Sequence, residues 1–366
     1  MDRFYALSHT PIAFHFRQNP RDFVVDEVPL YEFSGEGEHL ILHMRKKNLA
    51  TWDAIGMIAN HLGINAREIG YAGLKDKNAL TKQYISILKK HEEKLESFKH
   101  ENIKFLERTY HNNKIRLGHL KGNRFFIRLK KTNPTAAKKL SEAMKMIKKE
   151  GMPNFFGYQR FGADGNNYKV GEAILQGKRK ERNVKLKRLY INAYQSHMFN
   201  LWLSRRLEIN SLVSSFEPSA LCDVLNMPEE VITALKKQEH PFKIFKGDVL
   251  KHYPHGSPFE YEGEERDIER VNAKDVVPTG LLLGKRSRRA TGLAGEIEKE
   301  YDMDYTQVDG DRRYAWVYPE DVEYEYKENE AWFELHFTLP KGCYATVLIE
   351  ELAKRPLQEE VKKKEK

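Results

Sequence analysis

The feature that most constrains this 366-residue chain is a regular alternation of apolar and polar residues near its C-terminus. Residues 322–326 and, after a turn at 328–330, residues 333–337 place a large apolar side chain at every second position. Successive side chains of a β-strand point to opposite faces, so this pattern buries one face only. The segment therefore predicts an antiparallel hairpin packed on a core.

Similar strand patterns occur in the first 130 residues. Short apolar runs at residues 23–28, 39–44, 84–88 and 125–129 predict strands. A helix is expected between the second and third of them, with Thr51 as its N-cap and Gly63 as its stop. Its inner face is predicted to hold Trp52, Ile55, Ile58, Ala59 and Leu62.

The middle of the chain has a different, helical pattern. Pro134 opens a helix that Gly151 ends, and the span Lys187 to Arg206 repeats apolar residues at helical spacing. Residues 254–271 are turn-rich and acidic and predict a surface loop. A last helix is expected over residues 343–353.

These patterns predict an α+β protein in which one sheet domain is interrupted by an insertion. The sheet domain comprises residues 1–152 and 310–366, and the mostly helical insertion comprises residues 153–309. A chain of this length is long for one core, and both parts have acceptable domain sizes.

The charge of the chain favours a polyanionic partner. The net charge is +9, and basic residues cluster at 111–150, 178–188 and 285–289. Residues 111–150 alone contain twelve Lys or Arg against two Glu. Three separated cationic segments suit a long polyanion such as nucleic acid, with a solvated lysine-rich surface as the alternative.

Several classes of protein are disfavoured. No apolar run approaches a membrane span, and the N-terminus lacks an export leader, so we expect a cytoplasmic protein without membrane contact. Cys222 and Cys343 are too few for a disulfide framework or a cysteine metal site. Residues 280–287 lack the spacing of a phosphate loop, so we expect no nucleotide cofactor.

The sharpest candidate for chemistry is Asp76, between Lys75 and Lys77 in a turn that Gly73 precedes. Neighbouring cations lower the pKa of a carboxyl group, and glycine allows close approach. These surroundings suit a nucleophile or a general base. A plain solvated turn between strands is the alternative.

Four segments taken together resemble the TruD family of tRNA pseudouridine synthases along nearly the whole chain: residues 16–27, 73–83, 122–125 and 154–162. The resemblance implies a pseudouridine synthase core with a central antiparallel sheet, interrupted by the family's insertion (TRUD) domain. It implies a tRNA uridine as substrate, for bacterial members position 13 in the D arm. The glycosidic bond is broken, the base turns, and C5 is joined to the ribose. No cofactor or metal is implied, and we expect a monomer.

The resemblance also implies roles for residues at the reacting nucleotide. Asp76 is the expected catalytic residue, as a nucleophile on the anomeric carbon or as the base that starts glycal formation. Arg17 is expected to orient it, and Phe125 to stack on the extruded base while Phe126 packs in the core. Asn123 contacts the uracil edge or holds the catalytic loop.

The remaining predicted contacts are with the tRNA itself. Lys75 is expected to bind substrate, and with Lys77 to meet phosphate. Arg160, Lys285 and Arg286 are expected to hold the tRNA backbone, although Arg160 also suits a buried structural role. The alternative function is a non-catalytic tRNA-binding or RNA-chaperone protein, for which Asp76 would be dispensable.

Overall fold

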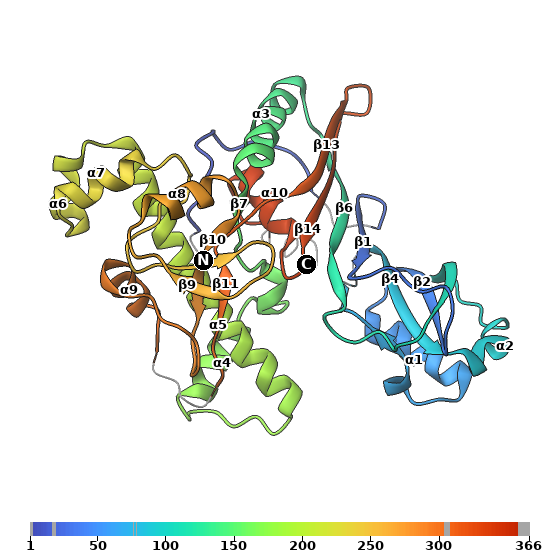
Figure 1. Ribbon diagram of the computed structural model, residues 1–366. Helices are drawn as coiled ribbons and strands as arrows, with labels where there is room; N and C mark the ends of the chain where they lie inside the picture. The colour runs from blue at the N-terminus through green and yellow to red at the C-terminus, as the bar shows by residue number, and fades with distance from the viewer. Residues whose placement is uncertain (1–2, 17–19, 76, 78, 304–307, 358–366) are drawn as a thin grey trace. The chain divides into compact units, whose positions relative to one another are not determined.

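The computed structural model describes residues 3–16, 20–75, 77, 79–303 and 308–357 and divides them into two compact units (Figure 1). The first, which we call the sheet unit, comprises the described residues within 12–144 and 319–342. The second, the helical unit, comprises those within 1–11, 145–318 and 343–362.

The sheet unit is built on one large sheet. Its strands follow the order β13-β14-β6-β1-β4-β2-β5, with β3 beside β4. The strands are β1 (Phe23–Pro29), β2 (His39–Lys47), β3 (Gly70–Tyr71), β4 (Leu80–Leu88), β5 (Ile103–His111), β6 (Leu120–Lys130), β13 (Glu320–Lys327) and β14 (Trp332–Pro340). The predicted hairpin is confirmed as β13 and β14, and β14 pairs with β6, so the two ends of the sequence share one sheet.

The sheet departs from the expected antiparallel arrangement at one place. β1 and β4 pair in parallel, with Val24 opposite Leu80, whereas the other pairs are antiparallel. The sheet is therefore mixed. Parallel neighbours need a long connection, and here it runs through β2, the first helix and β3.

The predicted helix after β2 is confirmed as α1 (Thr51–Leu62), which ends at Gly63 with a left-handed φ of 70°. Its buried residues Ile55, Ile58 and Leu62 pack on β2, β4 and β5. Two details of the prediction are wrong. Thr51 is the first helical residue and not the N-cap, which is Ala50, and Trp52 is 49% exposed. Three short helices follow: η1 (Ala66–Glu68), η2 (Lys89–His91) and α2 (Glu92–Leu95).

The second predicted helix is confirmed as α3 (Pro134–Glu150). Pro134 occupies its first position, and the apolar residues Ala137, Leu140, Met144 and Ile147 are buried as the spacing predicted. Thirteen described elements follow in the helical unit before the last helix, and most of them are helices.

These elements are β7 (Met152–Pro153), η3 (Tyr158–Phe161), α4 (Asn167–Leu175), α5 (Val184–Ser215), α6 (Pro218–Leu225), α7 (Glu229–Lys237), β8 (Val249–His252), β9 (Pro258–Glu260), α8 (Glu265–Asn272), β10 (Val276–Leu282), α9 (Gly292–Lys299), β11 (Asp311–Tyr314), β12 (Trp316–Val317) and the last helix α10 (Ala345–Ala353). A second sheet has the order β11-β10-β8-β9, and β7 pairs with β12. The segment 254–271 was predicted as a loop, which is wrong: it contains β9 and α8.

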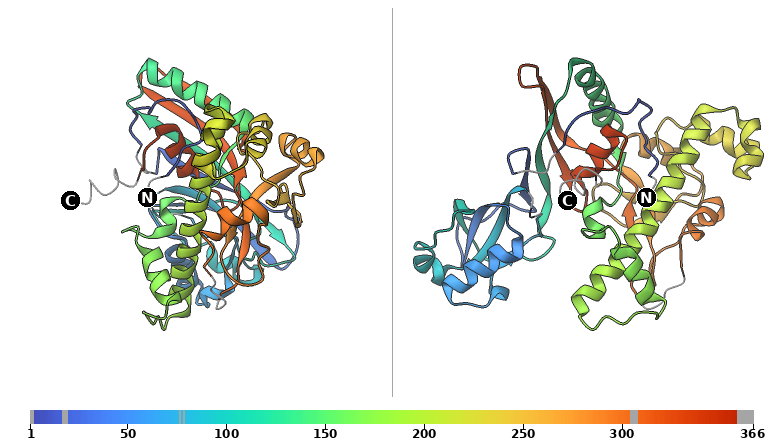
Figure 2. Two further views of the ribbon diagram at one scale, coloured as in Figure 1. Left: turned by 90° about the vertical axis from the view of Figure 1, so that its left-hand side faces the viewer. Right: turned by 180° about the vertical axis from the view of Figure 1, so that it is seen from behind.

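The long helix α5 runs through the helical unit (Figures 1 and 2) and packs against β10. Gly280 on β10 permits this contact, because a Cβ there would lie 2.2 Å from the Trp202 ring. Arg206 on the same helix is fully buried and forms a two-point ion pair with Asp248, at 2.7 and 2.8 Å. None of the helices in the described ranges has both the length and the apolar character needed to cross a membrane.

A buried histidine makes the stability of the helical unit depend on pH. His240 Nε2 lies 2.9 Å from the Tyr318 hydroxyl, and its Nδ1 accepts from the Phe242 N–H at 3.0 Å. Burial lowers the pKa of His240 to about 4, by more than its hydrogen bonding to Phe242 raises it. Burial likewise lowers the pKa of His197 on α5 to about 4.

We expect acid destabilisation that His240→Gln reduces. Because the folded pKa lies below the unfolded value of about 6.5, the unfolded chain binds the proton first as pH falls. Stability is therefore lost from about pH 6.5 down to about pH 4, by roughly 3 kcal/mol for this residue. Urea unfolding at a series of pH values measures it. The exposed His255→Gln is the control, and an unchanged pH slope in His240→Gln would contradict the assignment.

Candidate active site

The turn between β3 and β4 carries the segment Gly73–Lys77. It leads into β4 where that strand pairs in parallel with β1. Asp76, the predicted catalytic residue, and its neighbour Asn78 lie outside the described residues. The side chains described around the turn show how the protein holds it.

Lys75 joins the turn to two strands of the sheet. Its Nζ lies 2.7 Å from Glu27 Oε2 on β1 and donates to Asn123 Oδ1 on β6, also at 2.7 Å. The side chains of Lys75 and Glu27 are only 6% and 1% exposed. Glu27 Oε1 also accepts from the backbone N–H of Tyr84 on β4. A buried ion pair holds one geometry, so Lys75 is engaged within the protein, and its contact with phosphate stays a prediction.

Two buried side chains hold the backbone of the same turn. The Thr51 hydroxyl accepts from the N–H of Lys75 and donates to Gln83 Oε1, both at 2.9 Å. Gln83 Nε2 donates to the carbonyl of Gly73 at 3.3 Å. Both side chains are buried, so these hydrogen bonds do not compete with water. The first residue of α1 thus positions the turn.

A buried lysine lies at the same peptide. Lys46 at the end of β2 is fully buried, and its Nζ donates to the carbonyls of Leu49, at 2.6 Å, and Lys75, at 3.4 Å. The Lys75 carbonyl belongs to the peptide bond that joins Lys75 to Asp76. A buried lysine side chain therefore donates a hydrogen bond to the backbone next to the predicted catalytic residue.

Asp26, the residue before Glu27 on β1, is a second charged group in this region. Asp26 accepts from His43 Nε2 and from Lys82 Nζ, both at 3.1 Å. Burial by itself raises the pKa of Asp26, but the hydrogen bonds from His43 and Lys82 and the charge of Lys82 leave it below its ordinary value. The His43 ring stacks on Tyr84 with centroids 4.4 Å apart. These contacts stabilise β1 against β2 and β4.

The β6 residues next to this network differ in exposure. Asn123 is half-buried, and its amide oxygen accepts a hydrogen bond from Lys75. Of the two roles that the sequence allowed for Asn123, contact with uracil or support of the loop, this hydrogen bond corresponds to the second. Phe125 is 6% exposed and stacks on Phe337 with centroids 5.4 Å apart. Phe126 is half-buried against His336, so the expectation that Phe126 is the core aromatic of the pair is wrong.

The other two predicted cations of the sheet unit are Lys77 and Arg17. Lys77 is exposed on the turn, where its ammonium is accessible to a ligand. Arg17, the residue predicted to orient Asp76, lies outside the described residues. Its proposed ion pair therefore stays a prediction.

The helical unit holds the remaining predicted cations. Arg160 on η3 is half-buried, its Nε donates to the Ser196 hydroxyl at 3.1 Å, and its guanidinium lies 5.5 Å from the centroid of Phe156. Arg313 lies over the same ring at 3.9 Å and donates to Asn154 Oδ1 at 2.7 Å. Burial lowers the pKa of Arg313. The predicted motif 154–162 thus gathers two guanidinium groups around one aromatic ring.

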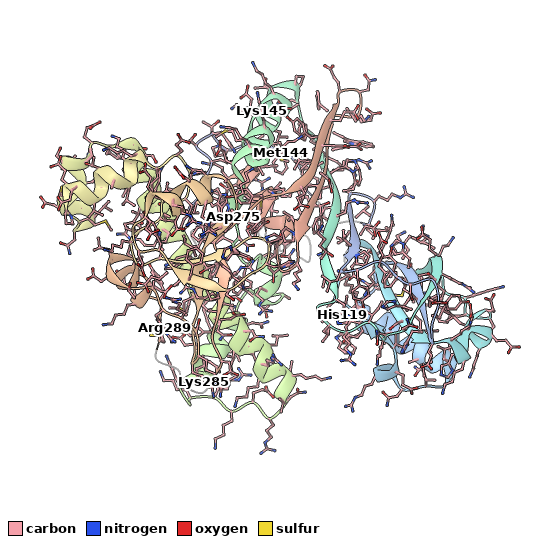
Figure 3. All side chains as sticks on the ribbon, viewed as in Figure 1. His119, Met144, Lys145, Asp275, Lys285 and Arg289 are labelled. Atoms are coloured by element: carbon pink, nitrogen blue, oxygen red, sulfur yellow. The ribbon has the colours of Figure 1, made fainter. Side chains whose placement is uncertain are left out.

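The loop that follows β10 presents Lys285 and Arg286 to solvent. Their side chains are 44% and 80% exposed, and both nitrogens lie 3.9 Å from Asp309 Oδ1, which is a loose contact. Figure 3 shows Lys285 and Arg289 on this loop, where Arg289 pairs with Asp302. Lys285 and Arg286 are therefore accessible, and Arg289 holds the loop.

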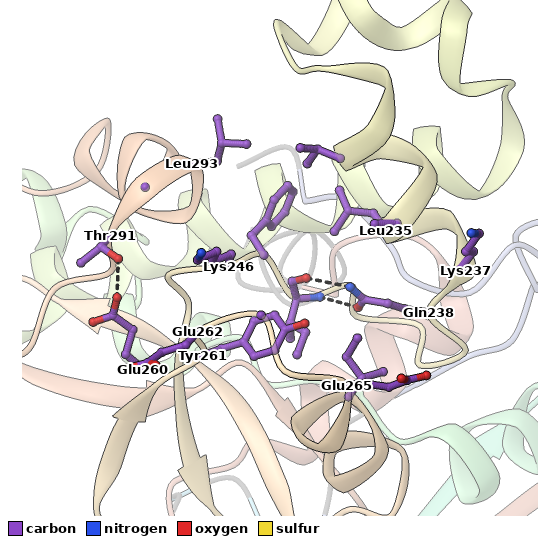
Figure 4. Close-up of a pocket in the computed structure, with 17 residues that line it drawn as sticks. Leu235, Lys237, Gln238, Lys246, Glu260, Tyr261, Glu262, Glu265, Thr291 and Leu293 are labelled. Carbon is purple, nitrogen blue, oxygen red and sulfur yellow. Dashed lines mark hydrogen bonds between the residues drawn. The ribbon is translucent and has the colours of Figure 1, made fainter.

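The helical unit also contains an open pocket of about 960 Å³ between α7, α8 and α9 (Figure 4). Its polar groups bond one another: Gln238 bonds both backbone groups of Ile244, and Thr291 donates to Glu260. Glu260, Glu262 and Glu265 line it with only Lys237 and Lys246 as cations. This acidic lining disfavours a phosphate backbone, so we do not assign the pocket to RNA.

Comparison with known proteins decides the family. A model of the family described as tRNA pseudouridine synthase D (TruD) matches residues 2–185 and 180–352. The chain belongs to the tRNA pseudouridine synthase D family. A relative named tRNA pseudouridine synthase D from Sulfurimonas denitrificans is 61% identical over 357 residues, covering 98% of this chain and 100% of that protein. Relatives of the same name from Nitratiruptor sp. and Wolinella succinogenes are 56% and 51% identical, each covering 98% of this chain and 100% and 99% of theirs.

A solved structure supports the TruD fold. The crystal structure of the putative tRNA pseudouridine synthase D (TruD) from Methanosarcina mazei covers 97% of both chains, with a TM-score of 0.69 and 23% sequence identity. At this identity the likeness concerns the fold alone. It confirms a mixed α/β TruD architecture with a central sheet and helices.

The sequence did not reveal several residues that hold the turn of residues 73–77. Glu27 ends the opening motif and Gln83 ends the turn motif, so their presence in these motifs was the available signal. Nothing in the sequence marks Lys46 as buried, because it belongs to a run of basic residues that is typical of a solvent-exposed strand end. Its burial arises from strand pairing and from the turn that covers it.

Proposed function

We propose that this chain, an isomerase of the tRNA pseudouridine synthase D family, converts uridine 13 in the D arm of tRNA to pseudouridine with Asp76 as the reacting carboxylate. Family membership makes it a tRNA pseudouridine synthase. The bond between N1 and C1′ breaks, the base turns, and C5 bonds to C1′. C5 loses a proton and N1 gains one, so the product has the mass of the substrate.

One observation carries the assignment of the active site to this turn. The residues that lead into Asp76, Gly73 and Lys75, are held by side chains from four elements: the buried Glu27 on β1, Thr51 on α1 and Gln83 on β4, and the half-buried Asn123 on β6. A plain solvated turn needs no such support. A catalytic group must be held within a fraction of an ångström of its productive position, which this network favours.

The charges near the turn support an anionic Asp76. Attack on C1′ and removal of a ribose proton both require the carboxylate form. Lys77 contributes an exposed positive charge on the turn, and Lys46 donates a hydrogen bond to the adjoining peptide. Arg17 completes this arrangement in our proposal, as the cation that orients the carboxylate.

The base must leave its stack before it reaches this turn. We propose that Phe125, which is 6% exposed and packs on Phe23 and Phe337, is uncovered when tRNA binds and then stacks on the extruded uracil. Asn123 holds the turn through its oxygen, which leaves its amide group oriented by Lys75 at the edge of the site. Lys77, Arg160, Lys285 and Arg286 would hold phosphates of the tRNA.

The proposal that uridine 13 is the modified nucleotide is tested with the purified protein and tRNA transcripts. Carbodiimide labelling followed by primer extension is expected to stop at position 13 only. A transcript with cytidine at position 13 is the matched control and is expected to show no stop. A stop at a different uridine would overturn the position and leave the enzyme class intact. The monomeric state and the cytoplasmic location stay predictions.

A further inference from the structure

The start of α5 is exposed on every side. Residues 182–189 are all exposed, although the helix begins at Val184, and burial begins only at Ile191. A helix that packs on a body hides one face, so these first turns extend beyond the packed part by about 9 Å, at 1.5 Å per residue. Figures 1 and 2 show them with the preceding loop at the lower edge of the helical unit. We call residues 177–189 the basic arm.

The basic arm carries seven Lys or Arg residues and one acid, Glu181. Glu181 accepts from the backbone N–H of Asn183 at 2.8 Å. In the described part of the chain, no ion pair involves the following six: Lys178, Arg179, Lys180, Arg182, Lys187 and Arg188. Other exposed cations of this unit do have acidic neighbours, such as Lys149 with Glu150. The positive charge of the arm is therefore not neutralised by acidic side chains of the described residues.

The clustering of basic residues at the start of α5 does not stabilise the helix. Cations in the first turns of a helix oppose its dipole, and they repel one another. The helix end is already capped, because the Asn183 side chain accepts from the N–H groups of Lys185 and Leu186 at 3.0 and 3.2 Å. The basic residues consequently contribute nothing to the cap, and their clustering is explained by an anionic partner.

Apolar side chains lie among the charges. Val184, Leu186 and Leu189 are 78%, 41% and 44% exposed. At 100° per residue only Leu186 and Leu189 share a side, which is too narrow for the broad apolar face of a helix that lies in a membrane surface. An RNA helix offers phosphates together with the sugar edges of its wide, shallow minor groove, and it matches both kinds of side chain.

We propose that the basic arm is a docking surface for the sugar-phosphate backbone of the tRNA substrate, with its cations on phosphates and Leu186 and Leu189 on sugar edges. The inference rests on the proposed function, because the partner is the same tRNA. It adds a contact surface within the helical unit that is separate from the turn carrying Asp76.

The test removes charge from the arm and measures salt dependence. The arm variant combines Arg179→Gln, Arg182→Gln, Lys187→Gln and Arg188→Gln. The charge-matched control carries glutamine at four exposed lysines elsewhere: Lys90, Lys99, Lys104 and Lys237. Affinity for unmodified tRNA is measured between about 50 and 200 mM salt.

The expected result is a change of slope. Because each phosphate contact contributes about 0.7 to 0.9 to the slope of log K against log salt, the arm variant is expected to lose roughly 3. Its affinity at low salt is expected to fall at least about tenfold, whereas the control slope is expected to change by less than about 1. A slope equal to that of the wild type, or to that of the control, overturns the proposal.

A second variant tests the apolar part. Leu186→Gln with Leu189→Gln keeps good helix formers and all charges, so we expect weaker binding with an unchanged salt slope. Flotation with anionic vesicles tests the alternative that the arm binds a membrane surface. If vesicle binding is lost in the arm variant while tRNA binding is unchanged, the arm serves a membrane surface and the proposal is overturned.

A single-turnover assay at saturating tRNA separates this inference from the proposed function. The arm variant is expected to form pseudouridine at the wild-type rate once tRNA is bound, because the arm belongs to a different unit from the turn. Absence of product from the wild type would overturn the proposed function, while the salt slope would still decide the role of the arm. Loss of rate at saturation in the arm variant alone would overturn its assignment as a docking surface.

Discussion

Replacing Asp76 with asparagine is expected to abolish pseudouridine formation and to leave tRNA binding intact. The substitution keeps the size and the hydrogen-bonding edge of the side chain but removes its charge and its basicity. Both chemical routes need the carboxylate, so the single-turnover rate is expected to fall at least about a thousandfold. Affinity for tRNA is expected to stay within about twofold, because phosphate contacts dominate it.

The control for this experiment is Asp53→Asn. Asp53 is an exposed aspartate on α1 in the same unit, and its substitution makes the same change of charge. We expect wild-type rates from it. If Asp76→Asn retained activity, the reacting group would lie elsewhere and the alternative of a non-catalytic role for this turn would gain support.

The second large effect is expected at the buried ion pair between Glu27 and Lys75. Glu27→Gln leaves the Lys75 ammonium buried without its counter-charge, and Lys75→Met does the same to the carboxylate. Breaking such a pair costs about 3 to 5 kcal/mol of the free energy of unfolding. The turn also loses its anchor, so we expect the turnover rate to fall about a hundredfold.

The double variant separates stability from catalysis. With Glu27→Gln and Lys75→Met together, neither charge is buried, so stability is expected to return to within about 1 kcal/mol of the wild type. Activity is not expected to return, because β1 and β6 no longer hold the turn. Urea unfolding and single-turnover rates measure the two effects.

The exposed ion pair of Arg108 and Glu96 provides the control, since its side chains are 39% and 61% exposed. Arg108→Gln is expected to change stability by less than about 1 kcal/mol. Additive losses of stability in the Glu27 and Lys75 double variant would show that the two residues do not act as a pair. Recovery of full activity in it would show that the pair serves only the fold.

Much of the fold follows from local sequence patterns. The alternation at residues 322–337 predicted the hairpin of β13 and β14, and the spacing in residues 134–151 predicted α3 with its buried face. Such patterns report which side of an element is apolar, and local periodicity suffices for that. They failed at Trp52, because an apolar residue in the first turn of a helix can extend past the sheet that the rest of the helix covers.

The active-site neighbourhood was harder to predict. Thr51 was interpreted as a helix cap because threonine at a helix start commonly serves that purpose. In the structure its hydroxyl bonds Lys75 and Gln83, which are distant in sequence. A hydroxyl takes whichever partner the fold brings within 3 Å, and no local pattern records that choice.

The sequence by itself determined the family, the strands and helices that local periodicity encodes, and Asp76 as the residue to test, because short motifs and apolar spacing are properties of the chain alone. The tertiary structure decided which charges are buried. The sequence suggests that Lys46 and Lys75 are surface lysines, yet pairing of β1, β2, β4 and β6 buries both side chains beside the backbone that leads into Asp76. Burial depends on neighbours far along the chain, and a charge acquires its role only when those neighbours exclude water from it.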